Sequence, residues 1–591
     1  MNKRSIAMGL ALAFFVSTAW NSAPVEAKQA SLSLSHGKKA LKVGQSFALK
    51  VTKGKKKVTW TVTKKGVVAL TKKKAKSVLV KGKKAGTATV IASCGKQKAK
   101  CRITVSAKKK ESTPVPSMEP TATVTASPTG ELTAEPTATA EPTATPTPTA
   151  VPTDEANLTY SGGVTNEMCK ASYWIKKSKS PDQLLISSEQ IQKLNQAMLK
   201  TKETNMFDLE NMKETYHGIS LRNSLASEST PNKDYFLNGT ALADKENYFE
   251  QMRKNIRDAQ ATETDQIRYA LCVKRAEMHS WPTKDCLGYS ATDADDELLS
   301  SVLIVNEPFV VKTITSDGKF CFGYSSNCTG WVETERLAFC DDKTEWLDAW
   351  QNKRFLVVTA DKIVMEKSNL QPDTSEVQLS FSTRLNLVPK DQIPANIAER
   401  GTWNNYVVYV PTRDKGGKYV KKVGLISQHH NVSIGYLPVT ERNILNVAFE
   451  CLGNRYGWGG MLDAMDCSMY TRSIYRCFGM ELPRNTNWQC GIPTKNVDVS
   501  SASVQEKQAA LDELPAGTLL FFPGHIMMYV GKAEGTHYVI SATGSLCDVG
   551  ESDVRSMYSV ILNTVDVRRK NGKTWLENIT KYICPWRYPV E

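Results

Sequence analysis

After its first 27 residues, this 591-residue chain contains no long hydrophobic run. No later stretch approaches the roughly 18 apolar residues that a membrane-spanning helix needs. The opening differs, because Lys3 and Arg4 precede an apolar run from Ile6 to Trp20 and a small-residue pattern ends at Ala27. This pattern is typical of a secretory signal peptide, residues 1–27, and it predicts an exported, soluble protein.

Acidic residues are absent from a long stretch of the chain. Residues 28–110 hold 24 Lys and one Arg but no Asp or Glu, a formal charge of +25, although the whole chain carries only +16. Such a segment attracts polyanions, and for an exported protein an anionic cell-wall polymer is a better partner than nucleic acid. Lysines that only keep the segment soluble are the alternative, but they do not explain the absence of acids.

Metal-binding and phosphate-binding patterns are missing as well. No CxxC or His/Cys cluster has zinc spacing, and the Gly-rich run at 456–460 lacks the Lys-Ser/Thr of a phosphate loop. We therefore expect no metal and no cofactor. Cysteine is not scarce, but the spacing of its 14 residues suits buried apolar positions better than disulfides. Only Cys94 and Cys101, on either side of a short turn, suggest a cross-hairpin disulfide.

Composition and periodicity divide the rest of the chain into six segments. Alternating strands separated by Gly and Lys-Gly turns predict a β-sandwich at residues 28–110. Nine Pro and no aromatic residue between 112 and 153 indicate an extended linker, residues 111–156. We expect a mostly helical region, two small β-barrels and a C-terminal α+β domain in the remainder, at residues 157–265, 266–345, 346–435 and 436–591.

A candidate nucleophile follows the Gly-rich run Tyr456-Gly457-Trp458-Gly459-Gly460, whose glycines let the backbone pass close to another element. Asp466-Cys467-Ser468 then opens a stretch with helical spacing of apolar residues. A Cys in the first turn of a helix lies among unpaired N–H groups at the positive end of the dipole, which lowers the pKa of its thiol. Cys467 is therefore the candidate nucleophile, although a single Cys is more often buried and inert.

A candidate base lies 58 residues later. His525 follows Gly524 and precedes an alternating strand, so we expect it at the exposed start of a half-buried strand. A Cys–His pair usually needs a third group that fixes the imidazole tautomer. Ser541 in the next strand is the candidate, with water or His537 as alternatives. A hydroxyl orients the ring less strongly than His, Asn or Asp would.

These motifs give the last segment a clear resemblance. Residues 436–591 resemble the NlpC/p60 family of papain-like cysteine peptidases, which cut bacterial cell-wall peptides. The matching features are Gly453, Tyr456–Gly460, Asp466-Cys467-Ser468, Leu482-Pro483-Arg484 with Gln489, Gly524-His525 and Ile540-Ser541-Ala542.

The earlier segments carry weaker resemblances. Residues from 157 onward are similar to the multi-domain subgroup with an N-terminal stabilising region and two SH3-like domains, on the marks Glu277–Thr283 and Gly330-Trp331-Val332. Residues 28–110 resemble bacterial Ig-like domains, on Val58-Thr59-Trp60 and Ala85–Val90.

The resemblance implies hydrolysis of the bond between γ-D-glutamate and the following diamino acid in peptidoglycan stem peptides, with Cys467 as nucleophile and His525 as general base. It implies a place for Tyr456 near the oxyanion or the substrate and for Asp466 near the amino end of the peptide. Further substrate contacts would come from Trp458, Ser468 and Arg484. The family most often has His where this chain has Ser541.

We therefore expect a secreted, cell-wall-associated cysteine peptidase. The main alternative is a non-enzymatic wall-binding or adhesion protein with a degenerate catalytic site. An amidase or acyltransferase that uses the same nucleophile is a third possibility.

Overall fold

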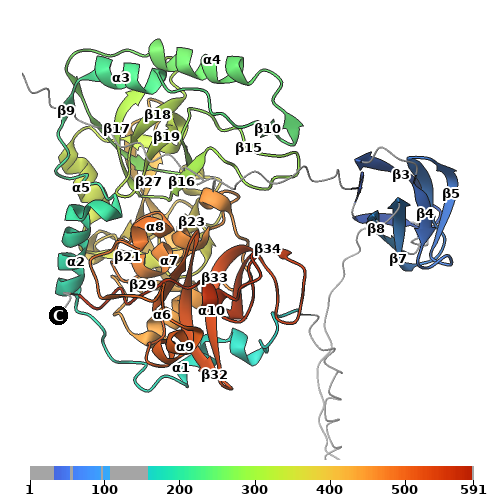
Figure 1. Ribbon diagram of the computed structural model, residues 1–591. Helices are drawn as coiled ribbons and strands as arrows, with labels where there is room; N and C mark the ends of the chain where they lie inside the picture. The colour runs from blue at the N-terminus through green and yellow to red at the C-terminus, as the bar shows by residue number, and fades with distance from the viewer. Residues whose placement is uncertain (1–31, 37, 54–57, 95–96, 107–157, 589–591) are drawn as a thin grey trace, which may run out of the picture. The chain divides into compact units, whose positions relative to one another are not determined.

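The computed structural model describes residues 32–36, 38–53, 58–94, 97–106 and 158–588 (Figure 1). The predicted signal peptide, residues 1–27, and the predicted linker, residues 111–156, lie outside these ranges. The chain divides into two compact units between Pro146 and Thr147, and each is described by itself. Within the described residues, no helix is both long enough and apolar enough to cross a membrane.

The first unit contains the predicted β-sandwich, built from two four-stranded sheets. Trp60 and Val90 are fully buried between the sheets, as expected for inward-facing positions of alternating strands. One sheet contains β1 Ser33–Leu34, β3 Ser46–Lys53, β6 Ser77–Gly82 and β5 Val68–Lys74. The other contains β2 Lys38–Lys42, β8 Gln97–Ser106, β7 Gly86–Cys94 and β4 Thr59–Val62.

The suggested disulfide in this unit is absent. Cys94 pairs in register with Gln97, whereas Cys101 lies opposite Val90, four residues further along the hairpin. Because disulfide formation needs the two Cα atoms to lie close together, this register keeps the sulfurs apart. Both residues are free cysteines, and Cys101 is a buried part of the core.

The segment that follows residue 158 contains helices, but the prediction of a mostly helical region is wrong, because connections and short strands make up more than half of residues 158–265. Ser187 caps the second helix with a capping box, which is the start that the sequence indicates. The helices are α1 Ala171–Ile175, α2 Ser188–Lys200, α3 Gly218–Ala226 and α4 Lys245–Arg257. Long connections and four two-residue strands separate them, namely β9 Thr215–Tyr216, β10 Phe236–Leu237, β11 Thr240–Ala241 and β12 Asp265–Gln266.

The first β-region, residues 266–342, forms one seven-stranded antiparallel sheet in the order β16-β14-β19-β18-β17-β13-β20. Helices α3 and α4 pack near this sheet (Figure 1), and Ala226, Ile256 and Trp331 form a shared apolar cluster. Its strands are β13 Arg268–Cys272, β14 Ala276–His279, β16 Leu299–Leu303, β17 Pro308–Ile314, β18 Phe320–Tyr324, β19 Thr329–Glu333 and β20 Leu337–Phe339, and β15 Leu287–Gly288 pairs with β10.

The second β-region, residues 343–435, begins with helix α5 Lys343–Gln351, where the sequence indicates a helical patch. Its strands form several small sheets with one shared core. They are β21 Phe355–Val358, β22 Lys362–Val364, β23 Gln378–Ser380, β24 Arg384–Asn386, β25 Asn396–Ile397, β26 Arg400–Gly401, β27 Asn405–Arg413, β28 Tyr419–Ser427 and β29 Val432–Ile434. The two β-regions thus account for the predicted strand-rich segments.

The C-terminal region combines helices with a six-stranded antiparallel sheet in the order β30-β35-β31-β32-β33-β34. The helices are α6 Glu441–Phe449, α7 Cys467–Arg476, α8 Thr486–Gln489, α9 Val504–Asp512 and α10 Trp575–Asn578. The strands are β30 Asn496–Asp498, β31 Leu519–Phe522, β32 His525–Ala533, β33 Thr536–Leu546, β34 Arg555–Thr564 and β35 Lys581–Ile583.

Apolar clusters cover both faces of this sheet. Residues of α6 and α7 pack with Ile526 and Met528 of β32, while α9 and α10 pack with Met527 and Tyr529 on the opposite face. The prediction of a half-buried strand after His525 is therefore wrong, because helices bury β32 from both sides.

Candidate active site

Helix α7 begins at Cys467, as the sequence predicts. The Asp466 side chain caps the helix by accepting a hydrogen bond from the Met469 backbone N–H at 2.8 Å. A Cys that follows a capping Asp lies in the first turn, with its side chain near the helix entrance. Cys467 is 9% exposed, so the sulfur lies at the edge of the core rather than on an open surface.

Two hydrogen-bonding groups lie beside the Cys467 sulfur. The Thr486 hydroxyl, at the start of α8, is 3.7 Å from Sγ. The backbone N–H of Ile526 also hydrogen-bonds the sulfur. Because Ile526 follows His525 directly, the fold brings the start of β32 to the start of α7, across 58 residues of sequence.

The pKa of Cys467 departs from the sequence prediction. Burial, with a smaller contribution from the charge of Asp466, raises the pKa of this thiol to about 11, against the lowering effect of Thr486 and the Ile526 N–H. The expected lowering by the helix N-terminus is therefore outweighed by the loss of water around the sulfur. In the resting protein Cys467 is a thiol.

His525 is also buried rather than exposed. Its ring packs against Phe522 and Trp575, with ring centroids 5.2 and 5.1 Å away, and the residue is 9% exposed. Burial lowers the pKa of His525 to about 3, and the positive charge of Arg569 acts in the same direction. The imidazole is therefore neutral at neutral pH and can accept a proton.

Ser541 contacts His525 as the sequence suggests. His525 Nε2 and Ser541 Oγ are 3.2 Å apart, and Ser541 is fully buried. The alternative partner, His537, is committed elsewhere, since its Nδ1 lies 3.0 Å from the Tyr529 hydroxyl and its Nε2 lies 3.4 Å from Asp512 Oδ1. Ser541, and not His537, is the side chain that bonds the imidazole.

Asp466, Ser468 and Arg484 form one buried network next to Cys467. Arg484 donates to both oxygens of Asp466, at 3.1 and 2.6 Å, and to the Ser468 hydroxyl at 3.1 Å. Burial alone would raise the pKa of Asp466, but the charge and hydrogen bonds of Arg484 outweigh it and hold that pKa below its usual value. Both carboxylate oxygens are thus engaged inside the protein.

The Gly-rich run lies against strand β16 of the first β-region. A Cβ atom on Gly459 would come within 2.8 Å of Leu299, and one on Gly460 would come within 2.9 Å of Val302. This close approach explains the glycines, as the sequence predicts, and both residues have positive φ. Arg484 also reaches this strand, because its Nε donates to the Ser301 hydroxyl at 2.9 Å.

The two aromatic residues of the run differ in environment. Tyr456 is 8% exposed and meets Tyr558 edge-on. Burial raises the pKa of Tyr456, and the nearby charges of Cys467, Asp466 and Asp295 add to the effect. Its hydroxyl therefore stays protonated and can donate a hydrogen bond. Trp458 is half-buried and packs against the apolar cluster that contains Tyr456 and Cys467.

An acidic loop of the first β-region, residues 293–297, also faces Tyr456 and Tyr558. Burial, followed by the charge of Asp293, raises the pKa of Asp295 to about 6 and that of Glu297 to about 7. Asp296 anchors the loop by pairing with buried His279 at 2.9 Å. The loop therefore gives the approach to Tyr456 a negative character.

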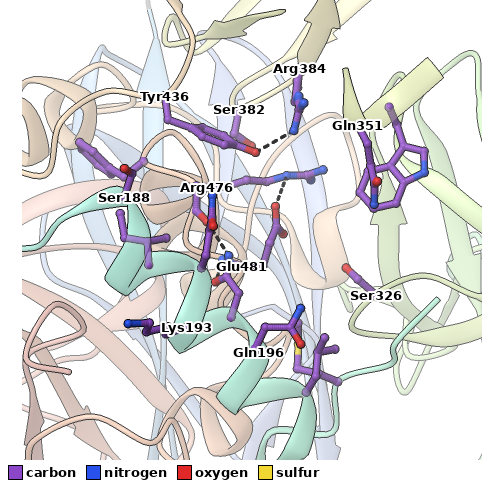
Figure 2. Close-up of a pocket in the computed structure, with 18 of the residues that line it drawn as sticks. Ser188, Lys193, Gln196, Ser326, Gln351, Ser382, Arg384, Tyr436, Arg476 and Glu481 are labelled. Atoms are coloured by element: carbon purple, nitrogen blue, oxygen red, sulfur yellow. Dashed lines mark hydrogen bonds and ion pairs between the residues drawn. The ribbon is translucent and has the colours of Figure 1, made fainter. Parts of the chain in front are cut away.

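A large cavity of about 1350 Å³ lies elsewhere, between α2, the two β-regions and the end of α7 (Figure 2). Arg384 points toward Tyr436 there, and its Nη1 donates to the Tyr436 hydroxyl at 3.0 Å. Neither Cys467 nor His525 lines this cavity. The candidate residues Cys467 and His525 are therefore separate from this cavity.

Sequence reasoning missed several residues around the site. Thr486 lies two residues after Arg484, so the motif around Arg484 could have drawn attention to it. Trp575, Asp295 and Glu297 are distant in the chain, and no spacing rule connects them with Cys467. Only the tertiary fold brings them together.

The model of the NlpC/P60 family matches residues 453–577. Dipeptidyl-peptidase 6 from Lysinibacillus sphaericus is 29% identical over 96 residues, which is 16% of this chain and 31% of that relative. The chain thus matches about a third of that protein's length.

A solved NlpC/P60 endopeptidase from Photobacterium damselae subsp. piscicida has the same fold over a larger part of the chain. The likeness covers 73% of this chain and 99% of that structure, with a TM-score of 0.57 and 17% identity. Its extent shows that the fold is shared well beyond the C-terminal region. Residues 453–577 of this chain therefore form an NlpC/P60 family domain, a family whose peptidases are cysteine peptidases.

Proposed function

We propose that this protein is a secreted, cell-wall-associated cysteine endopeptidase that hydrolyses the γ-D-glutamyl–diamino acid bond of peptidoglycan stem peptides. The observation that carries the proposal is the meeting of the Cys467 sulfur with the N–H group next to His525. A nucleophile and a base held at one helix–strand junction fit acyl transfer.

The proposed mechanism starts from the neutral pair. A hydrogen bond from His525 Nε2–H to Ser541 Oγ selects the tautomer in which Nδ1 accepts a proton. As the sulfur attacks the γ-carbonyl carbon, His525 takes the thiol proton, and the carbonyl oxygen becomes an oxyanion. We assign the Tyr456 hydroxyl as a donor to that oxyanion.

Two further steps complete the reaction, namely loss of the amine to form a thioester and hydrolysis of that thioester. The C–N bond breaks, His525 returns its proton to the leaving amine, and a thioester remains on Cys467. Water then attacks the thioester while His525 accepts a proton from it. The C–S bond breaks, His525 passes its proton to sulfur and restores the thiol, and the γ-carboxylic acid product leaves and loses its remaining proton to solvent.

The substrate contacts are part of the same proposal. Trp458 supplies an apolar surface, whereas Asp466, Ser468 and Arg484 are buried and bonded to one another, so their role would be to hold the start of α7 rather than to touch the peptide. A free amine on the substrate would complement the acidic loop at Asp295 and Glu297, whose pKa values are raised by burial and by the charge of neighbouring carboxylates.

The remaining regions would serve attachment. We propose that residues 28–110 are an Ig-like module that binds an anionic wall polymer through its lysines, and that the two β-regions are SH3-like domains. The segment before residue 28 would direct export, and residues 111–156 would separate the basic module from the peptidase.

Product analysis tests the proposed bond. Purified muropeptides that carry L-Ala-γ-D-Glu followed by a diamino acid would be digested with the protein and with Cys467→Ala, and the products weighed by mass spectrometry. We expect L-Ala-D-Glu and a peptide that begins with the diamino acid, only with the unaltered protein. Cleavage at another bond would refute the assigned specificity, and an absence of cleavage would refute the enzyme.

A further inference from the structure

The turn between the Gly-rich run and Cys467 has an unusual backbone. Gly459 and Gly460 have φ of 63° and 100°, and the non-glycine residues Leu462 and Asp463 have φ of 57° and 53°. Left-handed conformations are unfavourable for residues with a Cβ atom, and two in succession need support from surrounding structure. Leu462 gives little support itself, because it is 56% exposed.

One side chain of the first β-region supplies that support. Arg275 lies between β13 and β14, and its Nη2 donates to the carbonyl oxygens of Gly460 and Ala464, at 2.7 and 2.8 Å. These two acceptors are the two ends of the left-handed turn. The Nε of Arg275 lies 3.5 Å from Asp463 Oδ1, and the Nη1 of Arg275 donates to Ser380 Oγ at 3.3 Å. One guanidinium thus holds both ends and the middle of the turn.

The turn is directly connected to Tyr456 and Cys467, the two proposed active-site residues that precede β32 in the chain. Gly457 N–H donates to Met465 O at 3.1 Å, which fixes the Tyr456 segment beside residue 465. Residue 465 in turn leads into Asp466, the cap of the Cys467 helix. A shift of the turn would therefore move Tyr456 and Cys467 relative to each other.

We propose that Arg275 is a positioning residue of this active site, through which the first β-region sets the geometry of Tyr456 and Cys467. The expected effect of Arg275 on turnover rests on the proposed function, but the effects of Arg275 on the turn and on the Cys467 thiol can be measured independently. This role of Arg275 makes the first β-region part of the catalytic scaffold and not only an attachment module.

The test compares the full-length protein with Arg275→Ala and Arg275→Lys. The readouts are hydrogen exchange of residues 459–466, the pH dependence of Cys467 alkylation by iodoacetamide, and kcat and KM on muropeptides. For Arg275→Ala we expect faster exchange, a shifted alkylation profile and a fall in kcat on the order of 100-fold, with a smaller change in KM. Lys keeps the charge but offers one nitrogen where Arg275 uses three, so it cannot bond the two carbonyls, Asp463 and Ser380 together, and Arg275→Lys should show the same changes in smaller measure.

Arg253→Ala is the matched control. Arg253 on α4 is as buried as Arg275, with 10% of either side chain exposed, and it makes four hydrogen bonds away from the turn. Arg253→Ala should leave exchange at 459–466, alkylation and kcat unchanged.

Two outcomes would overturn the inference. One is that folded Arg275→Ala shows the same hydrogen exchange at residues 459–466 and the same Cys467 alkylation as the unaltered protein. If Arg275→Ala does not fold, the same result in Arg275→Lys would overturn the inference. The other is an equal effect of Arg253→Ala. If the unaltered protein cleaves no muropeptide, the proposed function fails, while the exchange and alkylation measurements still decide the role of Arg275.

Discussion

At the residue scale, Cys467 and His525 are both held in their neutral forms. Burial raises the pKa of the thiol and lowers the pKa of the imidazole, so both groups rest in their neutral forms rather than as a preformed ion pair. In the proposed mechanism, the proton moves from sulfur to the imidazole during attack on the substrate. This differs from the thiolate that a helix N-terminus alone would favour.

The pH dependence of kcat/KM tests this description of His525. Because burial lowers its pKa to about 3, the imidazole stays unprotonated, and competent as a base, when the pH falls through 6.5. We expect the acid limb of the profile, measured on soluble muropeptides, to lie well below pH 6.5. Tryptophan fluorescence at each pH would serve as the control for folding. Half-loss of activity near pH 6.5 in a folded protein would contradict the account.

Ser541 offers a second test at this scale. Ser541→Ala removes one neutral hydrogen bond to His525, and such a bond contributes about 1 kcal/mol. We expect kcat to fall about fivefold with KM nearly unchanged, since 1.36 kcal/mol corresponds to a factor of ten.

Ser545→Ala, an exposed change on the same strand, is the control for the Ser541 measurement. An unchanged kcat in Ser541→Ala would show that Ser541 does not orient the ring. A loss of several thousandfold would show that it does more than accept one hydrogen bond.

At the element scale, local signals predicted the starts of the key helices. The Ser187 cap, the Asp466 cap and the apolar spacing after Cys467 all report backbone geometry within a few residues. The burial of β32 was not predictable in this way, because α9 and α10 lie near it only in space. The sequence predicted a lowered pKa for Cys467, whereas burial raises it, and the residues that bury the sulfur come together only in the folded protein.

Asp466 links the α7 cap to the buried charge of Arg484, and Asp466→Asn separates these two roles. Asn still caps a helix, but it leaves Arg484 without its carboxylate partner. Removal of one partner from a buried pair costs about 3–5 kcal/mol, so we expect a loss of that size in the free energy of unfolding, measured with urea.

Asp182→Asn is the control for the Asp466 measurement. Asp182 pairs with Arg442 on the surface, so this change should have little effect. Equal stabilities of the two variants would contradict the structural role of the Asp466–Arg484 pair.

At the scale of the whole molecule, the sequence predicted a multi-domain chain rich in β-sheet, and the described residues form several sheets with separate apolar cores. The contacts between the first β-region and the active site could not be predicted, since Arg275, Ser301 and the acidic loop show no pattern that points to Cys467. Chain-distant contacts of this kind are specified by tertiary packing alone.

The basic segment provides a prediction at this scale. The full-length protein should bind purified cell walls more tightly than residues 157–591 do, because residues 28–110 carry 24 Lys and one Arg without an acid. Binding should weaken as NaCl is raised from about 0.1 to 1 M, where the screening length falls from about 10 to 3 Å. Co-sedimentation at each salt concentration measures this. Salt-independent binding, or equal binding by both proteins, would exclude the electrostatic attachment.

The most direct test of the central claim is to trap the covalent intermediate. The protein would be mixed with a muropeptide, quenched in acid within one turnover and analysed by peptide mass spectrometry, beside Cys467→Ala and the buried-cysteine control Cys451→Ala. The account predicts an acyl mass on the peptide that contains Cys467 in the unaltered protein and in Cys451→Ala, and neither acylation nor cleavage in Cys467→Ala. Undiminished cleavage by Cys467→Ala would contradict it.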